Sequence, residues 1–246
     1  MSEGGGVRNV GPTLVRADAR KREWFACNGV GMRAVSRAPL NMLLDGASQQ
    51  MILWTIQSPE AVAVLERQGV LVADAGDIEP SFQRAYRWME AQMLRRIGPS
   101  NHRGRSIWAW RAWTDQRARP DLRSTGHLAR GFRGARIEFG ANPATVLLSD
   151  FSLWHYVLNY WYLAASLKDQ HAFESEVKAA GLDYFATKPL PDPALHSRIE
   201  ASWNRIFDLD VFIKGITEKR GTRSIQATLW ALPLNAVREI TWFTAR

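Results

Sequence analysis

The sequence LLSDFSLWHYVLNYWYL at residues 147–163 predicts a change from strand to helix in the second half of the chain. Two leucines belong to a short apolar strand, and Asp150 then stands where a helix N-cap is expected. The helix that follows is dense in aromatic residues, yet it also contains His155 and Asn159. A helix that only filled a core would use Leu, Ile and Ala, so this composition favours the wall of a shaped pocket.

The overall composition is that of a globular protein with one large domain or two small ones. Of the 246 residues, 46% are hydrophobic, 23% are charged and 11 are tryptophan, an unusually high tryptophan content. The single cysteine, Cys27, excludes an internal disulfide framework and favours a reducing, cytoplasmic location. Polar residues interrupt the longest apolar stretch at 147–163, so no membrane span is expected.

The first fifty residues differ in character from the rest. They contain Gly4-Gly5-Gly6 and scattered arginines without a period of 2 or 3.6, and their apolar runs are too short for a secretory signal. At Met51 the sequence changes to MILWTIQ, a strand pattern. Residues 1–50 are either a disordered basic leader or a mis-assigned start upstream of a true start at Met51, and we favour the second interpretation. With either interpretation, residues 51–246 form a single globular domain.

From Met51 onward, helices and strands mix without a regular βαβ rhythm. Ser58, Pro59 and Gly69 bound a helix over 59–68, and a second helix ends at Gly98-Pro99. Asp192-Pro193 begins a further helix that runs to about residue 207. The expected strands are 52–56, 106–113, 135–139, 146–148, 225–232 and 240–243. This mixture predicts an α+β fold, a single compact domain of mainly antiparallel sheets with packed helices. The more polar segments 164–192 and 208–223 are expected to be loops.

Positive charge is concentrated in one segment of the chain. Residues 103–136 contain nine arginines, no lysine and only two acidic residues, a net charge of +7 in a chain whose total is +8. Within this segment Trp108, Trp110 and Arg111 follow one another on an expected strand. Arginines beside aromatic rings hold nucleotides or single-stranded nucleic acid. Further phosphate contacts are expected from Arg119, Arg123, Arg130, Arg133 and Arg136. The alternative is a solvated loop whose tryptophans turn into the core.

The aromatic helix supplies the candidate catalytic residues, His155 and Asp150. His155 lies at the margin between the polar face of the helix and its apolar face, which includes Trp154. It is therefore either a general acid–base that faces a pocket or a structural histidine whose hydrogen bonds are made at the edge of the core. Asp150 is either a catalytic carboxylate or simply the carboxylate that caps the helix. No metal site is expected, because the five histidines show no HxH or HExxH spacing and no cysteine cluster exists.

Several ordered segments resemble a known family. LWTIQ (53–57), SIWAW (106–110), RPDLR (119–123), RIEF (136–139), LLSDFSLWHYVLNYWYL (147–163), SWNRIFDL (202–209) and IQATLWALPL (225–234) are similar to the bacterial family called domain of unknown function 3841. The resemblance covers the chain from about Met51 to its end. It implies one fold-sized unit and a start near Met51, but no particular activity.

A weaker, fold-level resemblance links the order of these segments to ADP-ribosyltransferase-like domains, which bind NAD between two antiparallel sheets. It implies that Thr55 and Gln57 contact NAD. The position of the usual catalytic glutamate falls near Thr228, which has no carboxylate, so Asp150, Glu138 or Glu239 would have to substitute, or the domain only binds.

Three functions from different classes follow from these patterns. The first is a domain with a nucleotide-type pocket that transfers ADP-ribose from NAD, with Arg111 or Arg123 on phosphate and aromatic residues, among them Trp154, on the base. The second is a non-catalytic nucleic-acid or nucleotide-binding module that uses residues 103–136. The third is an interaction domain whose tryptophans only fill the core. Convergence of the candidate residues on one cleft would favour the first.

Overall fold

The computed structural model confirms an α+β fold, a mainly antiparallel sheet with packed helices. It describes residues 50–73, 78–102, 104–113, 118–124, 127–210, 213 and 223–246. The expectation for the leader 1–50 therefore lies outside the described residues except at Gln50, as does most of the loop expected at 208–223.

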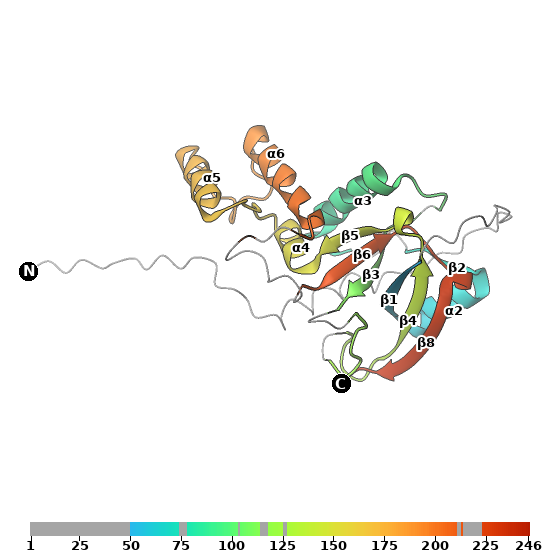
Figure 1. The fold of residues 1–246 in the computed structure, drawn as a ribbon. Coiled ribbons are helices and arrows are strands. Elements are labelled where there is room, and N and C mark those ends of the chain that lie inside the picture. The colour runs from blue at the N-terminus through green and yellow to red at the C-terminus, as the bar shows by residue number, and fades with distance from the viewer. Residues whose placement is uncertain are drawn as a thin grey trace, which may run out of the picture.

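The centre of the fold is a six-stranded sheet in which every pair of neighbours is antiparallel (Figure 1). Its strand order is β5-β6-β3-β1-β4-β8, and a separate two-stranded sheet joins β2 to β7. The strands are β1 (Met51–Gln57), β2 (Val70–Leu71), β3 (Ile107–Ala112), β4 (Arg133–Ala141), β5 (Leu147–Asp150), β6 (Ile225–Leu229), β7 (Leu232–Pro233) and β8 (Val237–Thr244).

The helices cover the two faces of this sheet unequally. Figure 1 shows α2 and β2 on one side, and α3 to α6 towards the other. The α-helices are α2 (Pro59–Gln68), α3 (Gln83–Ile97), α4 (Phe151–Leu158), α5 (Leu167–Ala179) and α6 (Pro193–Ser202), and short 3-10 helices form η1 (Pro143–Thr145), η2 (Trp203–Phe207) and η3 (Leu234–Ala236).

Strand periodicity divides the core into two clusters. Because successive side chains of a strand point to opposite faces, Leu53 packs with α2 while Ile56 packs with α3 and α4. In β3, Ile107 and Ala109 join the α2 side, whereas Trp108 and Trp110 join the other. We call these the α2 face and the α3 face of the sheet.

The helix ends follow the capping residues in the sequence. Ser58 caps α2 by accepting from the Ala61 N–H, and Gly69 ends that helix with a left-handed φ of 74°. Asp150 caps α4 by accepting from the Leu153 N–H at 3.0 Å, so its predicted capping role is confirmed. The strand-to-helix change predicted at residues 147–163 is likewise confirmed.

One expected loop is a helix. Residues 164–192 were expected to be irregular, but Leu167–Ala179 forms α5, with Ser166 as its N-cap. Only Phe173 and Val177 of this helix are buried. They stand four residues apart, one above the other on a single face, so the apolar stripe is too narrow to reveal the helix by periodicity.

Candidate functional site

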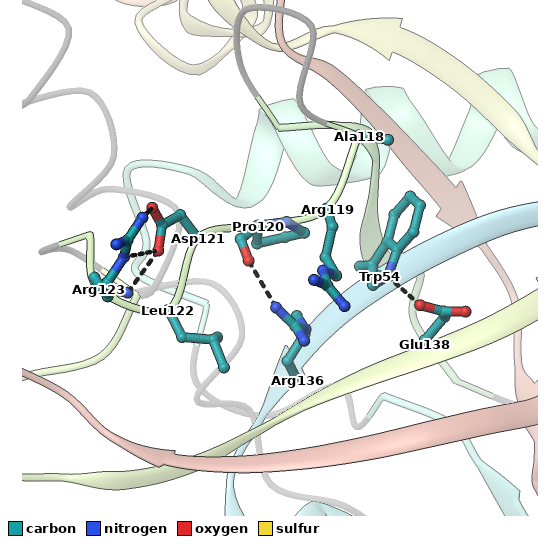
Figure 2. Close-up of a pocket in the computed structure, with 9 residues that line it drawn as sticks. All are labelled: Trp54, Ala118, Arg119, Pro120, Asp121, Leu122, Arg123, Arg136 and Glu138. Atoms are coloured by element: carbon teal, nitrogen blue, oxygen red, sulfur yellow. Dashed lines mark hydrogen bonds and ion pairs between the residues drawn. The ribbon is translucent and has the colours of Figure 1, made fainter.

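The α3 face of the sheet carries an open pocket of about 630 Å³ beside β1 and β4 (Figure 2). Strand residues form one wall, and the segment 118–123, which belongs to the connection between β3 and β4, forms the other. We call it the arginine pocket. Its lining residues are Trp54, Ala118, Arg119, Pro120, Asp121, Leu122, Arg123, Arg136 and Glu138.

Arg136 forms the inner part of this pocket and is nine-tenths buried, with 8% of its surface exposed. Its guanidinium donates to the Pro120 carbonyl at 3.0 Å and to the Thr241 hydroxyl at 3.2 Å. Burial lowers the pKa of Arg136, and the charge of Arg119 lowers it further, whereas Glu239 and Glu138 act in the opposite direction. The bond to Pro120 holds the 118–123 segment against the sheet.

Two further arginines stand on the loop wall. Arg123 is exposed and makes a bidentate ion pair with Asp121, with an Nη2–Oδ2 distance of 2.8 Å, and that carboxylate raises its pKa. Arg119 is also exposed. Among the described residues no hydrogen bond or ion pair holds its guanidinium, which lies near that of Arg136 in Figure 2.

The strand wall combines an aromatic ring with a carboxylate. The Trp54 indole Nε1–H donates to Glu138 Oε2 at 2.9 Å, and the two residues are opposite each other in the β1–β4 register. Glu138 Oε1 lies 3.9 Å from Nε of Arg238 on β8. The pocket therefore has a strongly cationic part at Arg119 and Arg136 and a polar aromatic part at Trp54 and Glu138.

The tryptophans predicted to bind a ligand lie in the core. Trp108 and Trp110 are 2% and 1% exposed, and Trp154 is 2% exposed. Trp108 packs against Trp154 with their ring centroids 4.9 Å apart, and Trp110 packs against Phe151. None of the three lines the pocket.

Thr55 and Gln57 lie on the opposite, α2 face, since they alternate with Trp54 and Ile56 along β1. Both are buried; the Thr55 hydroxyl donates to the Trp108 carbonyl at 2.8 Å, and the Gln57 amide donates to Thr55. The structure thus separates these two residues from the arginine pocket by the thickness of the sheet.

The two candidate catalytic residues lie outside the pocket: Asp150 is the N-cap of α4, and His155 stands in the last turn of that helix. Asp150 is 1% exposed, and its Oδ2 lies 3.7 Å from Nε of the equally buried Arg223. His155 is 7% exposed, and its Nδ1 lies 3.0 Å from the Phe151 carbonyl oxygen, one helical turn earlier. Among the predicted phosphate contacts, Arg119, Arg123 and Arg136 line the pocket, while Arg111 is an exposed residue of β3 elsewhere.

The comparison with protein families gives a match over residues 52–238 to the model described as Domain of unknown function (DUF3841). The chain belongs to the DUF3841 family. No curated protein and no solved structure matches it. The matched range of the DUF3841 domain includes every residue that lines the arginine pocket.

The sequence predicted Arg119 and Arg136 as phosphate contacts and Glu138 as a possible catalytic carboxylate, but it did not indicate Trp54 as a site residue. A signal for two of them exists in β4, whose sequence RGARIEFGA places Arg136 and Glu138 two residues apart on one face of an otherwise apolar strand. Charged residues at that spacing in a central strand indicate a polar site on the face they share. No such signal marks Trp54, because tryptophan is common in strands and its neighbours Leu53 and Thr55 fit a strand equally well.

The described residues contain no group of three or more His, Cys, Asp or Glu side chains arranged to hold a metal ion. Within the same ranges, no helix combines the length and the apolar character that crossing a bilayer requires.

Proposed function

We propose that this DUF3841 domain binds a phosphate-bearing, nucleotide-type ligand in the arginine pocket. One observation carries the proposal: Arg119, Arg123 and Arg136 line one pocket on the sheet, although Arg136 lies on β4 and the other two lie in the connection before it. Guanidinium groups bind phosphate oxygens through planar, charge-assisted hydrogen bonds. A volume of about 630 Å³ is within the range of small-molecule sites.

The charge balance of the pocket supports an anionic ligand. Arg123 is already paired with Asp121, but Arg136 is hydrogen-bonded, within the described residues, only to a neutral carbonyl and a neutral hydroxyl. The burial and the neighbouring Arg119 charge that lower the pKa of Arg136 both disfavour its protonated form. A phosphate between Arg119 and Arg136 would offset that repulsion and supply acceptors to both.

The aromatic surroundings favour a single nucleotide over a stretch of single-stranded nucleic acid. Single strands bind along successive exposed rings, but Trp108 and Trp110 are buried. Trp54 is 7% exposed and is the aromatic residue among those that line the pocket. One indole beside a cationic centre suits one base or ring with an attached phosphate.

Calorimetric titration of the full chain with ATP, NAD, AMP and inorganic pyrophosphate tests the proposal. Arg119→Gln is expected to weaken binding about tenfold or more, since a hydrogen bond to a charged group contributes about 1.5–3 kcal/mol. Arg111→Gln is the matched control, because it removes an exposed arginine of the same basic segment that does not line the pocket. Absence of binding by all four compounds, or equal weakening by both variants, would refute it.

A second candidate function, ADP-ribosyl transfer from NAD, is favoured by the carboxylate of Glu138 in the same pocket. Transfer breaks the bond between the nicotinamide nitrogen and the ribose carbon, releases nicotinamide, and forms a bond from that carbon to a nucleophilic atom of an acceptor protein or nucleic acid. A carboxylate stabilises the positive charge that develops on that ribose. In this second function, nicotinamide release from NAD is lost in Glu138→Gln while NAD binding persists. No nicotinamide release by the unmodified chain would leave binding as the only function of the pocket.

A further inference from the structure

The two edges of the main sheet differ in how they are covered. At one edge, β5 contacts η2 and α3 in addition to its strand neighbour β6. At the other edge, β8 has a single strand neighbour, β4, among the described residues. A strand edge presents a row of backbone donors and acceptors that can pair with another strand.

From Ile240 onward, β8 lacks the features that usually prevent such pairing. Val237–Thr244 reads VREITWFT and contains no proline, glycine or lysine. Its two charges, Arg238 and Glu239, are of opposite sign and stand at its beginning, next to a register shift in the pairing with β4. The last five residues, ITWFT, are uncharged and have high β-propensity, and Trp242 is 41% exposed.

We propose that two copies of this chain associate through β8, pairing antiparallel about a two-fold axis at Thr241. A two-fold axis places each residue opposite its counterpart at the same distance from the centre. Thr241 then faces the partner subunit's Thr241, and Ile240 faces the partner subunit's Trp242. The interface thus contains one Thr–Thr pair and two pairs of an aromatic with a β-branched residue, both of which stabilise antiparallel sheets.

We assign the strand that pairs with the edge of β8 to a second copy of this chain, because β8 is complementary to itself. Its net charge is zero, so two antiparallel copies do not repel each other. The register centred on Thr241 also brings the exposed Trp242 ring of each copy against a partly buried Ile240, on the α2 face of both sheets. Six strands from each copy form one continuous sheet of twelve.

Association at this edge has a consequence for the arginine pocket, and that consequence rests on the proposed function. Arg136 stands opposite Thr241 in the β4–β8 register and donates to its hydroxyl. A two-fold axis perpendicular to the sheet keeps the α3 face of both copies on one side. The two Arg136 residues then lie about 14 Å apart, three strand spacings, on one surface.

Sedimentation equilibrium of the full chain without ligand tests association independently of the pocket. A mass twice the 27.8 kDa of one chain is expected at micromolar concentration. Trp242→Lys introduces a charge at the centre of the interface and is expected to yield monomers. Leu94→Lys, at a residue of α3 that is 51% exposed, is the matched control and is expected to remain dimeric. A monomeric unmodified chain would overturn the proposal.

Cysteine cross-linking tests the register. In a chain whose single cysteine is replaced by Cys27→Ser, Thr241→Cys places two thiols opposite each other at a spacing that a disulfide can bridge. Thr244→Cys in the same background places them about 20 Å apart along the strand direction. Rapid disulfide-linked dimer formation is expected only for Thr241→Cys. Equal rates for the two variants, or no cross-linked Thr241→Cys dimer, would contradict the pairing.

Discussion

Asp150 offers a stability experiment that separates two roles of one carboxylate. One oxygen accepts from the Leu153 N–H and caps α4, and the other lies 3.7 Å from Arg223 Nε in a nearly fully buried ion pair. Asp150→Asn keeps an oxygen that can accept the capping hydrogen bond but removes the charge. Asp150→Ala removes both.

The expected losses follow from the burial of the pair. Removing one partner of a buried ion pair typically costs about 3–5 kcal/mol, because the other charge is left uncompensated. Arg223 retains a hydrogen bond to the Leu209 carbonyl at 2.8 Å, which favours the lower end of that range. We therefore expect Asp150→Asn to lower the free energy of unfolding by about 3 kcal/mol, and Asp150→Ala by about 1 kcal/mol more through loss of the cap.

Urea unfolding followed by tryptophan fluorescence measures both losses by linear extrapolation. Arg223→Met in the Asp150→Asn background provides the control, since removing the second charge is expected to recover part of the lost stability. If Asp150→Asn lies within about 1 kcal/mol of the unmodified chain, the ion pair does not stabilise the fold as argued. If the double variant is less stable than Asp150→Asn, Arg223 acts through contacts other than this pair.

Three further predictions concern other parts of the fold. Tyr160→Phe removes the hydroxyl that accepts from the buried Leu190 N–H at 3.1 Å, and urea unfolding should show a loss of about 1–3 kcal/mol; unchanged stability would contradict that role. Burial raises the pKa of Tyr184, so its contribution to stability is complete below about pH 10, where the unfolded chain begins to ionise, and decreases as the pH rises further. Tyr184→Phe should reduce the fall in melting temperature between about pH 9 and pH 11, and an equal fall in both proteins would be contrary evidence. Gly104→Ala places a Cβ 2.7 Å from the Ala73 carbonyl oxygen, which should lower the melting temperature through a loss of about 1–3 kcal/mol, whereas an unchanged melting temperature would show that this loop can shift.

The local elements of this fold were largely predictable from the sequence. Helix α2 lies between a serine cap and a glycine stop at the expected residues 59–68, and α4 begins after Asp150 as expected. These elements carry their own boundary signals, since capping is a short-range interaction. Helix α5 carries a cap at Ser166 but few buried side chains, and it was missed for that reason.

The strand order and the site could not be obtained in the same way. The order β5-β6-β3-β1-β4-β8 depends on contacts between distant segments, for which the sequence contains no local signal. Periodicity correctly placed Trp108 and Trp110 on one face of a strand, but it does not say whether helices or solvent cover that face. Here α3 and α4 cover it, so these tryptophans lie in the core.

The basic segment 103–136 therefore acts as two separate parts in the folded chain. Its strand residues Trp108 and Trp110 build the core, while Arg119, Arg123 and Arg136 reach one pocket because the β3–β4 connection returns to the sheet. The hydrogen bond from Arg136 to the Pro120 carbonyl joins the two walls. The cationic centre is thus produced by tertiary structure, and any ligand that draws Arg136 away from Pro120 would also release the loop wall. We therefore expect ligand binding at this pocket to be coupled to the position of the 118–123 segment through the Arg136 guanidinium.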